Sequence, residues 1–249
     1  MGHFTRFDAN SYELNKNSKK GVLILHGFSS STYETLPLGK FLSDKGLRVS
    51  IPNLPGHGTT IEDCNSIKYR EWLDFVEEKI AELSIECDDL YVVGLSMGAV
   101  LSLHLAGLFP INKVVTCATV LNFRNPFVIN YIIPIVNRII VKQKKINNSI
   151  NQENKKYSGY DHYPLIALNE FRKLTKYIKR RLHLVKCPVL YVHSNADKLS
   201  IPENVDLIFN NVSSPIKEKL IVDYASHHLF YDSEDKDLIF NTIYNFINE

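Results

Sequence analysis

Residues 90–98 read Leu-Tyr-Val-Val-Gly-Leu-Ser-Met-Gly, and no other stretch constrains the architecture as strongly. Leu90 to Val93 is a short, continuous apolar run, which is typical of a strand buried on both faces of a parallel sheet. Gly94 and Gly98 flank Ser96, and the residues that follow read as a helix. A serine between two glycines, after a strand and before a helix, is the pattern of a nucleophile elbow.

The two glycines have a steric purpose in such a turn. The serine backbone is held in an unfavourable region, and a side chain at Gly94 or Gly98 would collide with the neighbouring strand and helix. The turn lifts the hydroxyl of Ser96 above the edge of the sheet, and the start of the following helix adds free N–H groups and a positive dipole end. We therefore predict that Ser96 is a catalytic nucleophile, and the competing interpretation is a structural turn serine.

On both sides of this stretch, short apolar runs alternate with amphipathic segments, which is typical of a parallel sheet wrapped by helices. We expect helices over about 33–45, 72–83 and 233–247, because apolar residues recur there at helical spacing. The expected strands are 22–25, 47–51, 90–93, 114–117, 188–192 and 220–222. The sequence thus predicts an α/β fold, with a mostly parallel central sheet flanked by helices.

The alternation fails between residues 122 and 186, where no convincing strand can be recognised. This block holds an interrupted apolar run at 127–141, then a polar stretch, then a basic helix over about 165–184. A structureless loop of this length is uncommon in a compact domain, so we expect a helical insertion over one end of the sheet. The predicted domains are a core formed by 1–121 and 187–249 and a helical cap formed by 122–186.

The composition is that of an ordinary globular chain, with 249 residues, 45% hydrophobic and 22% charged, and a formal net charge of +2. These values exclude a disordered or collagen-like chain, and the balanced charge argues against a nucleic-acid-binding protein. The charge is nevertheless uneven, because residues 138–186 hold thirteen Lys or Arg and three Asp or Glu. This basic insertion is either a set of solvated helix faces or a surface attracted to anionic lipids or substrates.

Neither an export signal nor a membrane span is expected. Residues 1–10 contain no apolar stretch, so they do not read as a signal peptide, and the run at 127–141 is interrupted and falls short of the ~20 apolar residues of a membrane span. The cysteines lack the spacing of a metal clip or a redox motif and are Cys64, Cys87, Cys117 and Cys187. We expect reduced, mostly buried thiols in a cytoplasmic protein, without a metal site.

A nucleophilic serine needs amide donors aimed at the oxygen on which negative charge develops. The segment His26-Gly27-Phe28 follows the strand at 22–25, at the carboxyl end where open α/β sheets carry their sites. A sharp turn at Gly27 would let the Phe28 amide face the Met97 amide across the site. We expect the His26 ring to hold this loop in place through hydrogen bonds.

The acid and the base are expected after the nucleophile, because the triad of this fold runs Ser, Asp or Glu, His. Asp197 lies in a polar loop just past the strand at 188–192, and we predict that it accepts the imidazole N–H. Asp206 and Asp223 are poorly placed, since one falls in a predicted helix and the other ends a strand too near the histidines. The base is one of two adjacent histidines at 227 and 228, which residue type alone does not separate.

These segments together resemble the small carboxylesterase and monoacylglycerol lipase family of α/β-hydrolases. The motifs that carry the resemblance are LHGFSSS, PGHG, GLSMG, the Asn-Ala-Asp loop at 195–197 and SHHLFYD. The resemblance runs from about Gly21 to the C-terminus and is weak in the insertion, where the family carries a cap after the sixth strand of the fold. It implies a Ser-Asp-His triad, an oxyanion hole from the Phe28 and Met97 amides, and hydrolysis of short to medium acyl esters without a cofactor.

The resemblance also bears on the base. The family commonly has an acidic residue five places after its catalytic histidine, and Asp232 lies five places after His227. An ungapped comparison therefore selects His227, whereas one inserted residue would select His228. The doubled histidine departs from the family pattern, so His228 remains the alternative.

The resulting hypothesis is a serine esterase that forms an acyl-enzyme on Ser96, with His227 as the base and Asp197 as its partner. A thioesterase, a lysophospholipase or a peptide hydrolase would use the same triad. A serine at position 96 argues against the dehalogenases and epoxide hydrolases of this fold, which need a carboxylate nucleophile. A catalytically silent lipid-binding protein is the alternative from another class, and the apolar residues of 127–136 suit either a lid over an acyl chain or ordinary cap packing.

Overall fold

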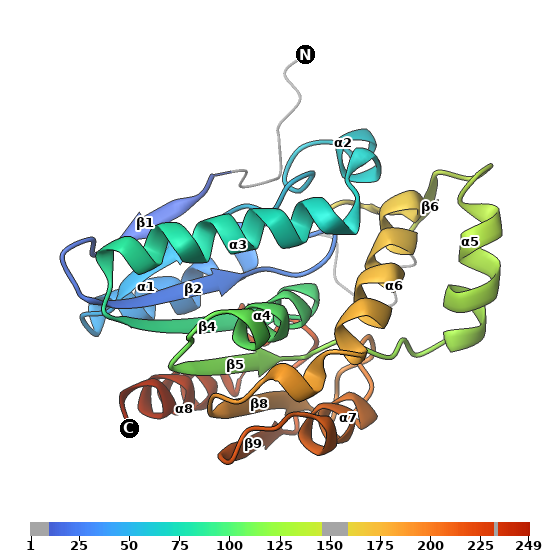
Figure 1. Cartoon of the computed structure of the whole chain (residues 1–249). Coiled ribbons are helices and arrows are strands. Elements are labelled where there is room, and N and C mark those ends of the chain that lie inside the picture. Colours follow the sequence, from blue (N-terminus) through green and yellow to red (C-terminus); the bar gives the residue numbers. More distant parts are fainter. Residues whose placement is uncertain (1–9, 146–158, 232–233) are drawn as a thin grey trace.

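The computed structural model describes residues 10–145, 159–231 and 234–249. Its centre is a seven-stranded sheet in the order β1-β3-β2-β4-β5-β8-β9 (Figure 1). These strands are β1 (Tyr12–Leu14), β2 (Lys20–Leu25), β3 (Arg48–Ile51), β4 (Asp89–Leu95), β5 (Lys113–Cys117), β8 (Val189–Ser194) and β9 (Lys217–Val222). Only β1 runs antiparallel to its neighbour, so the predicted α/β fold with a mostly parallel sheet is confirmed.

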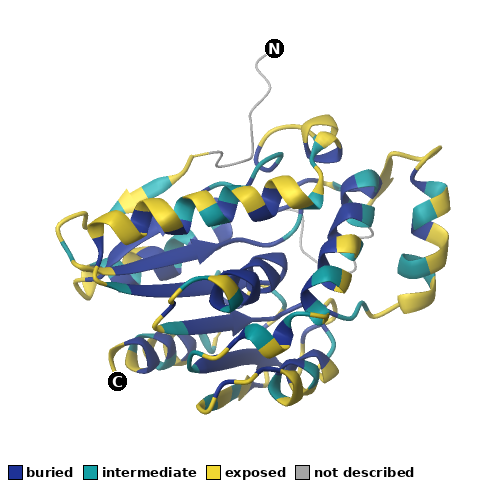
Figure 2. Ribbon diagram, viewed as in Figure 1, coloured by how far each residue is buried: buried dark blue, intermediate teal, exposed yellow. Residues whose placement is uncertain are grey.

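Helices cover both faces of this sheet. They are α1 (Leu36–Asp44), α3 (Tyr69–Glu86), α4 (Met97–Leu108), α7 (Glu203–Asn211) and α8 (Lys236–Asn248), whereas the short helix α2 (Ile61–Ser66) contacts the region between β5 and β8. In β2, Val22 and Ile24 pack in the core shared with α1 and α8, while Leu23 and Leu25 pack in the core shared with α3 and α4. Because successive side chains of a strand point to opposite faces, a strand covered on both faces has no polar side, as Figure 2 shows for the buried sheet.

The segment predicted as a cap, 122–186, falls within the region between β5 and β8, which is called the cap region below. It contains a π-helical turn (Val128–Ile132), α5 (Ile133–Val136), β6 (Lys142–Lys144), β7 (His162–Pro164), α6 (Leu165–Lys179) and a 3₁₀ turn (Leu182–Leu184). Helix α6 crosses one end of the sheet, and α5 lies outside α6 (Figure 1). Residues 146–158 of this region lie outside the described residues.

The sequence analysis missed three short strands and placed the start of one helix too early. We expected no strand in the cap region, yet β6 and β7 pair antiparallel, and β1 was also missed. Each of these strands has only three residues, which is too short for an alternating pattern to stand out.

The helix expected over 33–45 begins later, because Pro37 occupies the first turn of α1 and a separate 3₁₀ turn, Thr32–Glu34, precedes it. Glu34 therefore lies ahead of the helix, and its side chain is buried.

Two expectations about the whole chain can also be compared with the structure. Within the described ranges, no helix combines the length and the apolar character that crossing a bilayer requires. The four cysteines are free thiols, three of them buried and Cys187 partly buried, as predicted.

Candidate active site

Ser96 occupies the turn between β4 and α4, and its backbone is strained, with φ 57° and ψ −112°. A β-carbon on Gly94 would overlap the Gly98–Ala99 peptide, and a β-carbon on Gly98 would overlap the carbonyl group of Leu25. Both glycines are therefore sterically required, as predicted. The Ser96 amide donates a hydrogen bond to the Cys117 carbonyl at 2.8 Å, which ties the turn to β5.

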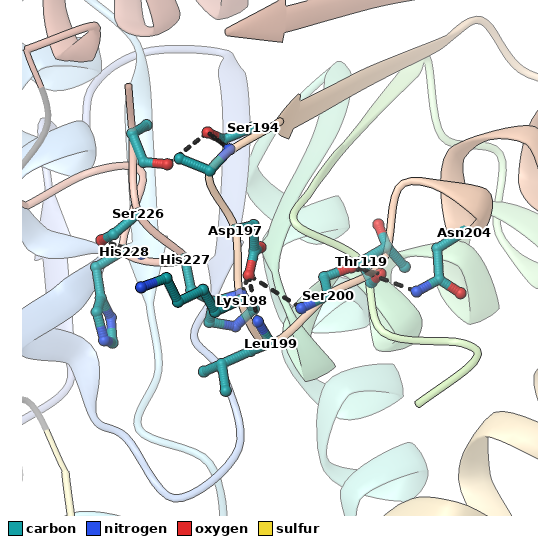
Figure 3. A network of polar contacts seen from close by, with 12 residues as sticks. Thr119, Ser194, Asp197, Lys198, Leu199, Ser200, Asn204, Ser226, His227 and His228 are labelled. Atoms are coloured by element: carbon teal, nitrogen blue, oxygen red, sulfur yellow. Dashed lines mark hydrogen bonds and ion pairs between the residues drawn. The ribbon is translucent and has the colours of Figure 1, made fainter. Parts of the chain in front are cut away.

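Asp197 lies in the loop after β8, and its carboxylate uses both oxygens. Oδ1 accepts hydrogen bonds from the amides of Leu199, at 2.7 Å, and Ser200, at 3.0 Å. Oδ2 lies 2.7 Å from Nδ1 of His227. Figure 3 draws the polar network around this carboxylate, which joins the loop after β8 to the loop that carries the histidines. The structure thus brings the predicted acid together with one of the two candidate bases.

The hydrogen-bond partners of Asp197 stabilise its ionised carboxylate. Burial by itself raises the pKa of this carboxyl, but the hydrogen bond and charge of His227 and the two backbone amides outweigh it, so the pKa falls below its usual range. An ionised carboxylate on Nδ1 keeps the imidazole proton on that nitrogen. The other ring nitrogen of His227, Nε2, is then the one that can accept a proton.

His228 has a different environment from its neighbour. Its Nδ1 lies 3.7 Å from Oε2 of Glu34, and its ring lies apart from the Asp197 carboxylate (Figure 3). The interaction with Glu34 raises the pKa of His228 above its ordinary value, against the effect of burial. The two side chains also differ in exposure, 49% for His228 and 12% for His227. Each histidine therefore has its own carboxylate partner.

The amides predicted to form an oxyanion hole lie at the ends of β2 and β4. Met97 is the first residue of α4, so its N–H has no partner inside the helix. Within the described part of the chain, neither the Met97 amide nor the Phe28 amide donates a hydrogen bond. The Leu54 amide donates to Nε2 of His26 at 3.0 Å, so His26 does hold this loop. Burial lowers the pKa of His26, which favours the neutral ring that can accept this bond.

Other polar residues considered in the sequence lie in other environments. The Nδ1 atom of His57, the histidine of the PGHG motif, lies 3.0 Å from the Pro55 carbonyl oxygen of the same motif. Asp206 pairs with Lys219 at 2.9 Å, and Asp223 accepts a hydrogen bond from the side chain of Asn195. In the described ranges, no three His, Cys, Asp or Glu side chains are arranged to hold a metal ion.

Sequence reasoning missed Glu34, a carboxylate that is 4% exposed. Its Oε1 accepts a hydrogen bond from the Gly27 amide at 2.5 Å. Burial favours the neutral acid, but His228, His26 and the Gly27 amide outweigh it and lower the pKa of Glu34 to about 2. The one sequence signal that could have revealed this residue is Pro37, since a proline in the first turn of a helix leaves Glu34 in the preceding turn.

Comparison with known proteins gives consistent matches. Residues 16–234 match the model of the family described as serine aminopeptidase, S33. The thermostable monoacylglycerol lipase of Bacillus sp. (strain H-257) is 30% identical over 210 residues, 82% of this chain and 80% of its own length. The carboxylesterase of Bacillus subtilis (strain 168) is 25% identical over 236 residues, 94% of each chain. A solved structure described with the metagenome-derived lipolytic enzymes LipS and LipT superposes with a TM-score of 0.88 at 28% identity, covering 96% of this chain and 97% of its own.

Proposed function

This chain belongs to Hydrolase_4, the α/β-hydrolase family described above as serine aminopeptidase, S33, and is a serine hydrolase of the lipase and esterase kind, and from this premise we propose that it cleaves carboxylic esters of short to medium acyl chains. The observation that carries the proposal is the 2.7 Å contact between Asp197 Oδ2 and His227 Nδ1, in a chain whose Ser96 has a strained backbone. Strain of this kind persists where the surroundings enforce it, and it gathers at functional sites.

The first step of the proposed reaction forms an acyl-enzyme. Nε2 of His227 takes the proton of the Ser96 hydroxyl while Oγ attacks the carbonyl carbon of the ester. The amides of Phe28 and Met97 donate hydrogen bonds to the oxyanion that develops. When this intermediate collapses, the ester C–O bond breaks, and the alcohol leaves with the proton that His227 took up.

The second step repeats this sequence with water. His227 deprotonates a water molecule, which attacks the acyl carbon, and the proton then returns to Oγ of Ser96 as the acid leaves. Asp197 stays ionised throughout, since its carboxylate keeps the tautomer of His227 and stabilises the imidazolium formed at each attack. These residues need no cofactor for the reaction.

We propose that residues 122–186 act as a cap that selects the substrate. The Phe171 ring on α6 stacks on the Phe28 ring, with the two centroids 5.4 Å apart. Phe123 contacts Phe171 in turn, at 5.3 Å between centroids. An aromatic group thus links the cap region to the proposed oxyanion loop, and an apolar wall of this kind suits an acyl chain.

A substrate panel tests the proposed activity. The panel contains p-nitrophenyl esters from acetyl to palmitoyl, monoacylglycerols, lysophospholipids, acyl-CoA thioesters and aminoacyl p-nitroanilides. We expect the highest kcat/KM on esters of short and medium acyl chains. Preference for the thioesters, lysophospholipids or anilides would replace the ester proposal by one of the alternative activities, and saturable lipid binding without turnover would indicate a binding protein.

The partner that we propose for the cap region is an anionic lipid surface. Its outer segment carries seven exposed apolar side chains, which are Phe127, Tyr131, Ile132, Ile135, Ile139, Ile140 and Val141. Residues 124–145 include five basic residues and no acidic one. A segment that combines exposed apolar side chains with cations fits a bilayer surface, because the apolar side chains can enter the acyl boundary while the cations contact anionic headgroups.

The lipid contact can be tested with a matched pair of isoleucines. Ile139 and Ile85 are both 84% exposed, but Ile139 lies in the basic segment and Ile85 lies between Glu82 and Glu86 on α3. We expect Ile139→Ser to weaken binding to phosphatidylglycerol vesicles about tenfold, the effect of one buried isoleucine, while Ile85→Ser leaves it unchanged. Vesicle flotation at low and high salt measures this. Equal binding by the two variants, or equal binding to neutral phosphatidylcholine vesicles, would exclude the proposed contact.

A further inference from the structure

Glu34 joins the oxyanion loop to the second histidine. Its Oε1 accepts the hydrogen bond of the Gly27 amide at 2.5 Å, and its Oε2 lies 3.7 Å from Nδ1 of His228. Gly27 directly precedes Phe28, whose amide is one of the two proposed donors to the oxyanion. The carboxylate is thus bound to the residue next to that donor, although Glu34 contributes nothing to the reaction steps described above.

The orientation of the Phe28 amide depends on the peptide group that it shares with Gly27. The Leu54 amide donates to Nε2 of His26, so the ring proton lies on Nδ1, and Nδ1 donates to the Gly27 carbonyl at 2.9 Å. Because a peptide group is planar, fixing the Gly27 oxygen also fixes the direction of the Phe28 N–H. Glu34 holds the amide of Gly27, so Glu34 and His26 together restrain the chain on both sides of its α-carbon.

Gly27 also shows how near Glu34 lies to the proposed nucleophile. A β-carbon added to Gly27 would lie 2.9 Å from Oε1 of Glu34 and 3.2 Å from Cβ of Ser96. Both side chains therefore lie within about 3.2 Å of one point, and no side chain fits between them. Glu34 is 4% exposed, so water screens its charge only weakly.

A negative charge in this position has an electrostatic cost. An uncompensated carboxylate beside the reacting centre would oppose the oxyanion that forms on the substrate. His228 faces this carboxylate directly, and Lys145, whose Nζ lies 2.9 Å from Oγ of Ser29, acts on it from the cap region. Glu34, Lys145 and Asp197 are the charged groups that act on His228, and Glu34 dominates among them.

We propose that Glu34 is a positioning residue for the reaction and that His228 is its counter-ion. The carboxylate holds the Gly27 amide and so keeps the Phe28 N–H directed at the oxyanion, while the His228 imidazolium cancels the carboxylate charge. The inference rests on the proposed function, and it assigns the doubled histidine two separate tasks. His227 moves protons, and His228 neutralises Glu34.

Substitutions at both partners separate the two parts of the proposal. Glu34→Gln keeps an oxygen for the Gly27 amide and removes the charge, whereas Glu34→Ala removes both. We expect kcat on a p-nitrophenyl ester to fall about tenfold in the first and about hundredfold in the second, with KM changed less than about threefold, because a small misplacement of a transition-state donor costs up to about hundredfold. His228→Gln removes the nearest positive partner of the carboxylate and should lower kcat about tenfold.

The charge argument also predicts how the changes combine. Once residue 34 is neutral, His228 has no charge to cancel, so Glu34→Gln/His228→Gln should be no slower than Glu34→Gln alone. Glu77→Gln is the matched control, because Glu77 pairs with His104 at 2.7 Å on α3 and α4. This control should keep the kcat of the unchanged protein. The NMR titration midpoint of the His228 ring should fall in Glu34→Gln and not in Glu77→Gln.

Labelling of Ser96 by a fluorophosphonate distinguishes the possible failures. The labelling rate should fall with kcat in the Glu34 variants, measured on folded protein as judged by thermal unfolding. If Glu34→Gln and Glu77→Gln label and turn over at the same rate, or if the two single changes multiply in the double variant, the proposal is wrong. An unreactive Ser96 in the unchanged protein would instead overturn the proposed function, and this inference with it.

Discussion

Ser96→Ala is expected to lower kcat for ester hydrolysis by about 10⁶-fold, to the activity that binding and the oxyanion donors retain on their own. The reason is that the proposed acyl-enzyme has no alternative attacking group. The Ser96→Ala variant should still fold, because Ser96 Oγ forms no hydrogen bond within the described part of the chain. Its removal therefore leaves no donor or acceptor among the described residues without a partner. The backbone strain at φ 57° is the same for either side chain.

Ser102→Ala is the matched control for this prediction. Ser102 lies on α4, is fully buried and donates a hydrogen bond to the Gly98 carbonyl at 2.9 Å. A serine-to-alanine change at this position therefore removes a hydroxyl from the helix that follows Ser96, but not from the strained turn. We expect it to retain full kcat and fluorophosphonate labelling. Steady-state kinetics with intact-mass detection of the label compares the two variants. Residual activity above about a thousandth in Ser96→Ala, with no contaminating esterase, would exclude Ser96 as the nucleophile.

His227→Gln is expected to lower kcat by about 10⁵- to 10⁶-fold, whereas His228→Gln should lower it only about tenfold. Glutamine at 227 can still donate a hydrogen bond to Oδ2 of Asp197, so the buried carboxylate is not left without a donor. It cannot take the proton of the Ser96 hydroxyl, because an amide is not a base near neutral pH. The loss of kcat in His227→Gln would therefore reflect the loss of proton transfer and not a rearrangement of the loop that carries the histidines.

The same pair of variants decides between the two histidines. We expect kcat at saturating p-nitrophenyl ester to differ by about 10⁴- to 10⁵-fold between them, with similar thermal unfolding midpoints. The reverse order, a severe loss in His228→Gln and a mild one in His227→Gln, would make His228 the base. That result would also remove the counter-ion role proposed for His228.

Much of the fold could be predicted, because the relevant signals are local. A strand covered on both faces is mostly apolar, and β2, β4 and β5 were recognised from their short apolar runs between amphipathic segments. The Ser96 turn was recognised because the motif Gly-Leu-Ser-Met-Gly lies between a predicted strand and a predicted helix, although one of the overlaps that require its glycines, between a β-carbon on Gly98 and Leu25, involves a residue distant in sequence. The strands β1, β6 and β7 were missed, because three residues are too few to show an alternation of apolar and polar side chains.

The candidate site could be predicted only in part. Asp197 was selected as the candidate acid from its position after a strand, but the choice between His227 and His228 rested on Asp232, which lies outside the described residues. Adjacent residues in a loop point to different partners, and sequence spacing does not reveal which one meets Asp197. The structure makes that distinction, because Nδ1 of His227 lies 2.7 Å from Asp197, whereas Nδ1 of His228 lies 3.7 Å from Glu34.

The amino-acid sequence by itself determined most strands of the sheet, the glycine-flanked turn at Ser96 and the residue types of the site, because these follow from local apolar runs and from a short motif. Only the tertiary structure decided how the carboxylates are shared between the histidines, and it alone revealed Glu34. That carboxylate lies seven residues from Gly27 and far along the chain from His228. Its burial and its two partners arise from the packing of separate segments, a property that no single stretch of the chain encodes.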